Sequence, residues 1–104
     1  MFLFDPKRVN VLGEYGGIGL PVENHLWWNK RNWGYVQFKN SDEVTAEYVK
    51  YANILKDYVK RGFSAAVYTQ TTDVEGEVNG LMTYDRKVIK IDEAAVKKAN
   101  QSVI

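Results

Sequence analysis

The chain contains no cysteine. This absence excludes disulfide frameworks and zinc sites built from thiolates, and it leaves both secreted and cytosolic origins open. An excess of one charge is also missing, because 14 Lys and Arg stand against 13 Asp and Glu, for a formal net charge of +1. No overall field favours phosphate backbones or anionic lipid, so we expect neither nucleic acid nor a membrane as a partner.

The sequence also has no long apolar run. Its opening segment, MFLFDPKR, turns charged too soon for a secretory signal or a membrane span. Localisation therefore stays undetermined: periplasmic or extracellular if a parent protein carries a signal upstream, and cytoplasmic otherwise. A length of 104 residues suits one domain over residues 1–104 and leaves little room for a second hydrophobic core.

Aromatic residues are abundant, with three Trp, seven Tyr and four Phe. Many aromatics suit contact with carbohydrate, and they suit a dense core equally well. The glycine-containing stretch 15–40 is predicted to be a long irregular loop. Its aromatic side chains either stack on sugar rings or pack the loop onto the domain, and its lone histidine, His25, bonds either a sugar hydroxyl or a backbone carbonyl; the aromatics are Trp27, Trp28, Trp33 and Tyr35.

A first strand and helix are predicted before residue 62. The β-branched run VNVLG over 9–13 favours a short strand that ends at Glu14. A helix over 41–61 follows, with Asn40 or Ser41 as its N-cap and Glu43 placed to complete a capping box. Apolar residues recur at helical spacing along it and predict a core-facing stripe: Val44, Tyr48, Tyr51, Leu55 and Tyr58.

A second strand and helix are predicted in the remainder. The run FSAAVYT over 63–69 lacks alternation, which favours a parallel strand buried on both faces. Tyr68, Gln70 and Asp73 mark its exit, and Asp92 caps a last helix. The order of elements predicts an α/β fold with parallel strands and two helices. Polar residues follow each strand, where barrel enzymes place their sites.

Two segments now carry a resemblance to a known family. VNVLGEYGGIGLPVENHLWW and AAVYTQTTDVEGEVNGLMTYDRKVIK together resemble the seventh and eighth strand regions of the catalytic barrel in family two glycoside hydrolases, the β-galactosidase-like enzymes. The resemblance covers nearly the whole chain. It implies a fragment of a (β/α)8 TIM barrel, roughly the last two β/α units, or about a quarter of a barrel of some 250 residues.

The resemblance also implies a function and a site. In those enzymes a Glu-Tyr-Gly segment ends the seventh strand and supplies the nucleophile, and Glu14, Tyr15 and Gly16 match it. The full-length enzyme would be a retaining hydrolase of O-glycosyl bonds in β-galactoside-like substrates, without a cofactor or metal. A tryptophan of the family is replaced by Tyr68, which leaves the sugar open. The residues expected to bind substrate are Tyr15, Trp27, Tyr68, Gln70 and Asp73.

One catalytic group has no counterpart in the sequence. The Asn-Glu pair that carries the general acid/base of the family belongs to an earlier strand of the barrel. Because acid catalysis contributes roughly 100- to 10,000-fold, we expect the isolated chain to be inactive. Two β/α units cut from a barrel would also leave strand edges unpaired, which predicts a homo-oligomer.

Two other functions remain open. The first is a non-catalytic carbohydrate-binding module that uses the Trp-rich loop and folds as an all-β sandwich, although the helix predicted over 41–61 argues against that architecture. The second is an interaction domain without sugar contact. The carboxylates Asp73, Glu75 and Glu77 lack the spacing of a calcium loop, so no metal is expected.

Overall fold

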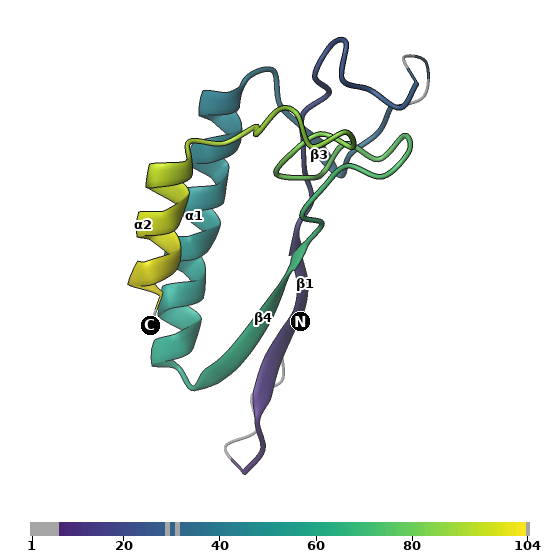
Figure 1. Ribbon diagram of the computed structural model, residues 1–104. Helices are drawn as coiled ribbons and strands as arrows, with labels where there is room; N and C mark the ends of the chain where they lie inside the picture. Colours follow the sequence, from purple (N-terminus) through teal and green to yellow (C-terminus); the bar gives the residue numbers. More distant parts are fainter. Residues whose placement is uncertain (1–6, 29, 31, 104) are drawn as a thin grey trace.

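Two parallel strands and two helices form the framework of the molecule. A computed structural model describes residues 7–28, 30 and 32–103, so most of the opening segment lies outside it. Strands β1 (Asn10–Gly16) and β4 (Phe63–Thr69) pair in parallel, and helix α1 (Ser41–Lys60) lies between them in sequence. Helix α2 (Glu93–Ser102) packs along α1, as Figure 1 shows. The predicted α/β arrangement of parallel strands and two helices is confirmed.

Local capping fixes where the helices begin and end. The Glu43 amide donates to Asn40 Oδ1 at 2.9 Å, and Glu43 Oε1 in turn accepts from the Lys39 amide at 2.9 Å. The return bond thus reaches the residue before the N-cap, one position earlier than in an ordinary capping box. Gly62 follows α1 with φ 103°, a backbone conformation that favours glycine. Asp92 caps α2 by accepting from the Ala95 amide at 3.2 Å.

The prediction that the second strand is buried on both faces is wrong. β4 does form over 63–69, but Ser64, Ala65 and Val67 are exposed. On the β1 side, Val9 and Val11 are exposed as well. The sheet of β1 and β4 has two strands within the described residues, and α1 packs on one side of it. An apolar run without alternation correctly indicated a parallel strand, but it could not show whether a second layer is present.

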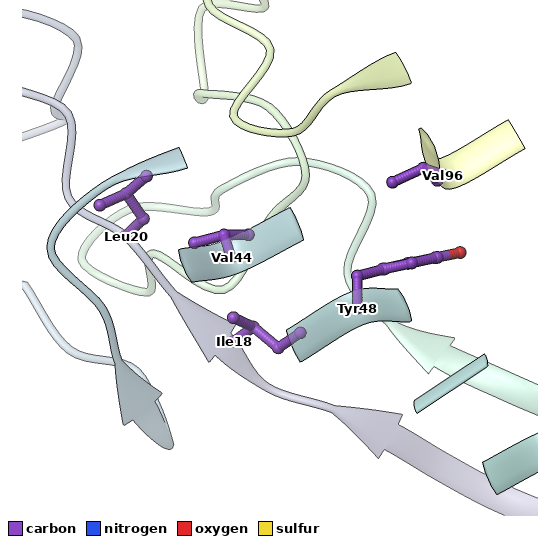
Figure 2. Close-up of a cluster of buried hydrophobic side chains, with 5 residues drawn as sticks. All are labelled: Ile18, Leu20, Val44, Tyr48 and Val96. Carbon is purple, nitrogen blue, oxygen red and sulfur yellow. The ribbon is translucent and has the colours of Figure 1, made fainter. Parts of the chain in front are cut away.

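The hydrophobic core lies between the amino-terminal half of α1 and the segment that follows β1. Figure 2 shows its five central side chains, which come from the segment around β2 (Ile18–Gly19) and from both helices: Ile18, Leu20, Val44, Tyr48 and Val96. β2 pairs in parallel with β3 (Val36–Gln37), so the stretch predicted as irregular loop contains two short strands. The Tyr48 hydroxyl donates to Asn100 Oδ1 at 2.7 Å, which joins the helices.

The segments that follow β1 and β4 interlock above the carboxyl ends of both strands (Figure 1). The Leu20 amide donates to the Val78 carbonyl at 2.9 Å, and the Val78 amide donates to the Trp33 carbonyl at 2.8 Å. Asn79, which is fully buried, accepts a bond from the Tyr35 amide through its side chain at 3.3 Å. The two loops therefore form one packed layer at the end of the sheet where an α/β enzyme carries its site.

Candidate functional site

Glu14 is an exposed residue of β1, two positions before the strand ends. Leu12 pairs with Ala66 and Glu14 pairs with Val67, so the ladder skips Gly13. An extra residue of this kind is a β-bulge, which bends a strand and re-aims a side chain. Leu12 is buried, whereas Val67 is 53% exposed. Since directly paired residues share a face of a sheet, Glu14 emerges with Val67 on the face opposite α1.

Tyr15 and Tyr68 pair across the two strands on the α1 side of the sheet. Their rings meet edge to face with centroids 5.3 Å apart, and Tyr68 also lies 5.1 Å from the ring of Tyr48. Burial raises the pKa of both hydroxyls, most strongly that of Tyr68. The sequence placed both tyrosines beside the substrate with Glu14. In the structure the two tyrosines do not share the sheet face of Glu14, because they pack against the aromatic side chains of α1.

Gln70 and Asp73 do follow β4 at the carboxyl end of the sheet, as predicted. Gln70 has φ 67°, and Asp73 is 5% exposed. Asp73 Oδ1 accepts from Lys90 Nζ at 2.7 Å and from the Gly80 amide at 2.9 Å. Lys90 is fully buried and also donates to the Val78 carbonyl at 3.0 Å. Asp73 was expected to bind substrate, but here its carboxylate holds the loop after β4 together.

The Asp73–Lys90 pair is held against the cost of desolvation. Burial raises the pKa of the Asp73 carboxyl, and burial lowers the pKa of the Lys90 ammonium, in each case outweighing their mutual attraction. Buried ion pairs commonly show this balance, since both ions lose their hydration. The pair therefore specifies one arrangement of the loop more than it adds net stability.

His25 and Trp27 tie the loop after β1 to the loop after β4. His25 Nδ1 lies 2.8 Å from Asp85 Oδ2, while Asp85 Oδ1 accepts from the Thr83 hydroxyl at 2.5 Å. Trp27 packs edge to face on Tyr84, with centroids 5.5 Å apart, yet remains 57% exposed. The partner of His25 is thus a carboxylate, which differs from both the sugar hydroxyl and the backbone carbonyl considered from sequence.

The Asp85 contacts predict a pH dependence. The hydrogen bonds from Thr83 and then His25 lower the pKa of Asp85 from 3.8 to about 2. A carboxyl with a depressed pKa stabilises the fold above its unfolded pKa, and that contribution is lost as the pH falls toward 2. We expect Asp85→Asn to show a smaller fall in melting temperature than the parent chain between pH 4 and pH 2, measured by circular dichroism. Equal falls in both proteins would contradict this.

Sequence reasoning missed the buried polar residues of the loop layer. Asn79, Thr83 and Lys90 are all fully buried. One signal in the sequence indicates that Lys90 is buried: it lies between two apolar residues, Ile89 and Ile91. The signal is weak, because lysine is almost never fully buried without a partner. The partner, Asp73, lies 17 positions away, so the pair is visible only once the loop is folded.

A hollow of about 250 Å³ opens between the sheet and the helices, on the opposite face from Glu14. It is largely apolar and is lined near the amino end of β4 by Leu12, Leu55, Tyr58 and Phe63 among others. Its lining contains no carboxylate and no histidine among the described residues. The candidate chemistry therefore remains with Glu14.

Comparison with known proteins gives no assignment. The chain matches no protein-family model, and a search of curated proteins finds no match. Within the described residues, no three His, Cys, Asp or Glu side chains are grouped so as to hold a metal ion. In the same part of the chain, neither helix has the length and apolar character needed to cross a membrane.

Proposed function

We propose that this chain is the C-terminal part of a family two glycoside hydrolase barrel and that Glu14 is its nucleophile. The observation that carries the proposal is the position of Glu14, near the carboxyl end of a parallel strand and on the face opposite α1. In a TIM barrel the helices lie outside and the catalytic residues stand at the carboxyl ends of the strands. On this proposal, the exposed face of β1 and β4 is the barrel interior.

The chemistry requires a second carboxyl group from another part of the barrel. Glu14 attacks the anomeric carbon, the bond to the leaving oxygen breaks, and the acid protonates that oxygen. Water then attacks the glycosyl ester on Glu14, with the second carboxylate acting as base. Retaining enzymes hold the two carboxyl groups about 5 to 5.5 Å apart. The chain has no counterpart of the family's Asn-Glu pair, so the isolated chain is expected to be inactive.

The exposed face of the β1–β4 sheet supports the proposal that this chain is one part of a larger barrel. Val11 and Val67 are 51% and 53% exposed, although β-branched residues of parallel strands are normally covered. Further strands of the same barrel would cover them. In their absence we expect the purified chain to self-associate, and light scattering that shows a monomer at every concentration would count against this.

Co-expression with the upstream part of the parent barrel tests the function. We expect the complex to hydrolyse an aryl β-galactoside and the isolated chain to show no turnover above background. Glu14→Gln should abolish this activity. Its matched control, Glu93→Gln at the exposed start of α2, should retain it. A complex that assembles but hydrolyses none of a panel of aryl glycosides would contradict the proposal.

A non-catalytic carbohydrate-binding module is the alternative that one observation favours. Trp27, Trp28 and Trp33 are each between 45% and 57% exposed, which is unusual for so large an apolar side chain. The all-β sandwich expected for such a module is not the observed architecture. The tryptophans themselves still require an explanation.

A further inference from the structure

Trp28 and Trp33 border a hollow of about 310 Å³ on the loop layer. Sites for small molecules begin at about this size. The hollow is open to solvent, and its lining combines two indole rings with two carboxylates: Trp28, Trp33, Val74, Glu75, Gly76 and Glu77. Neither Glu14 nor any other residue of β1 belongs to it.

Backbone pairing holds Trp33 beside Glu77. The Trp33 amide donates to the Gly76 carbonyl at 2.7 Å, and Trp33 and Glu77 form a parallel bridge. Val74 and Glu77 exchange backbone bonds of 3.1 and 2.9 Å, which closes a tight turn around Glu75 and Gly76. The Glu77 carboxylate also accepts from the buried Asn79 amide group at 3.3 Å. The Glu77 carboxylate and the Trp33 backbone are thus positioned before any ligand arrives.

The conformation of Glu75 is consistent with a role for its side chain. Its φ is 51°, in the left-handed region where glycine is favoured. Glu75 occupies this position of the turn although a glycine, Gly76, is the next residue. Strain of this kind persists where surrounding structure supports it, and it clusters at ligand sites.

We propose that this hollow is a pyranoside-binding subsite, separate from Glu14. The apolar C–H face of a sugar ring would lie on the half-exposed indoles, which are 46% and 45% exposed for Trp28 and Trp33. Sugar hydroxyls would donate to Glu75 and Glu77, because an ionised carboxylate only accepts hydrogen bonds. Aromatic lining with a few placed polar groups is the usual composition of such a site. Binding here does not depend on the proposed hydrolytic role of Glu14.

A cationic ligand is the competing occupant, since indole faces and carboxylates also attract ammonium groups. One observation favours the sugar. The hollow is open, whereas a ring of aromatics that recognises a cation encloses it.

NMR titration of the isolated chain with lactose and with methyl β-D-galactopyranoside tests the proposal. We expect saturable shifts of the Trp28 and Trp33 indole N–H signals with a dissociation constant on the order of 1 mM, while the Glu14 amide signal stays in place. Trp33→Ala, Glu75→Gln and Glu77→Gln should each weaken binding by about fivefold or more, and Glu93→Gln should not. Preserved spectra will show that the glutamine variants fold.

Three results would overturn the proposal. One is the absence of saturable shifts up to the solubility of both sugars. The second is binding that the Glu75→Gln and Glu77→Gln variants leave unchanged. The third is tighter binding of tetramethylammonium than of either sugar at the same signals, which would indicate a cation site. None of these results bears on hydrolysis by the co-expressed complex, so this subsite and the nucleophile fail or succeed separately.

Discussion

Lys90→Met should destabilise the chain by about 3 to 5 kcal/mol, because it leaves the Asp73 carboxylate buried without its counter-ion. Total stabilities of small domains are about 5 to 15 kcal/mol, so the variant should lose a large share of its free energy of unfolding. Methionine is close to lysine in length, which limits the cavity term. Urea unfolding followed by circular dichroism measures the change as a lower midpoint at similar slope.

The double variant Asp73→Asn/Lys90→Met separates the ion pair from packing. The asparagine introduced by Asp73→Asn would keep an acceptor for the Gly80 amide, and the Val78 carbonyl would keep its bond from the Leu20 amide. We therefore expect the double variant to recover at least half of the loss. If the loss in the double variant equals the sum of the losses in Asp73→Asn and Lys90→Met, the two residues are not coupled. That result would contradict the account of Asp73 as a structural residue.

The pH dependence of the Lys90→Met variant has a definite sign. Burial already raises the pKa of Asp73 with Lys90 present, and removal of the cation raises it further. A carboxyl with a raised folded pKa favours the fold at low pH, and that advantage is lost as the pH rises through the folded pKa. The stability deficit of the variant should therefore be smaller at pH 4 than at pH 7. A deficit that grows on acidification would contradict burial as the dominant cause.

In the co-expressed complex, Glu14→Gln should lower hydrolysis by roughly 10⁴- to 10⁶-fold, the range for loss of one essential catalytic group. The amide is nearly isosteric, so folding and assembly should not change. Because Glu14 is exposed in the isolated chain, the melting temperature of that chain should shift little. Steady-state rates with an aryl β-galactoside, read beside the melting curve, distinguish lost chemistry from lost structure.

Rescue by a small anion adds a second readout. Glu14→Gly leaves space where the carboxylate stood, and added azide can attack the anomeric carbon from the same side. The product should be a glycosyl azide of inverted configuration, since no covalent enzyme intermediate then precedes it. A Glu14→Gly complex that azide does not rescue, with an activated aryl leaving group, would weaken the assignment of Glu14 as nucleophile.

The sequence predicted the framework of the fold well. The capping residues Asn40 and Asp92 and glycine at position 62 are local signals, and both helices begin and end close to them. The strand over 63–69 was also found within its bounds, since an apolar run before polar residues is a local pattern. Its exposure was misjudged, because burial depends on whether other strands are present.

The candidate site was predicted less completely, for a geometric reason. Position after a strand identified Gln70 and Asp73, but position alone does not say which face a side chain takes or what it meets. The bulge at Gly13 decides that Glu14 leaves the sheet on the face opposite Leu12, where regular alternation would have put both residues on one face. The pairing of Asp73 with Lys90 depends on a loop closing over 17 residues. Contacts of this kind have no local signature.

Trapping of the covalent intermediate tests the central claim most directly. A 2-deoxy-2-fluoro-β-galactoside with a dinitrophenyl leaving group needs little acid assistance to react, and its fluorine slows the release of the ester. After incubation with the co-expressed complex, digestion and mass spectrometry should place one fluoroglycosyl group on Glu14. Labelling of a different carboxylate, with Glu14 unmodified in an inactivated complex, would contradict the assignment of Glu14 as the nucleophile.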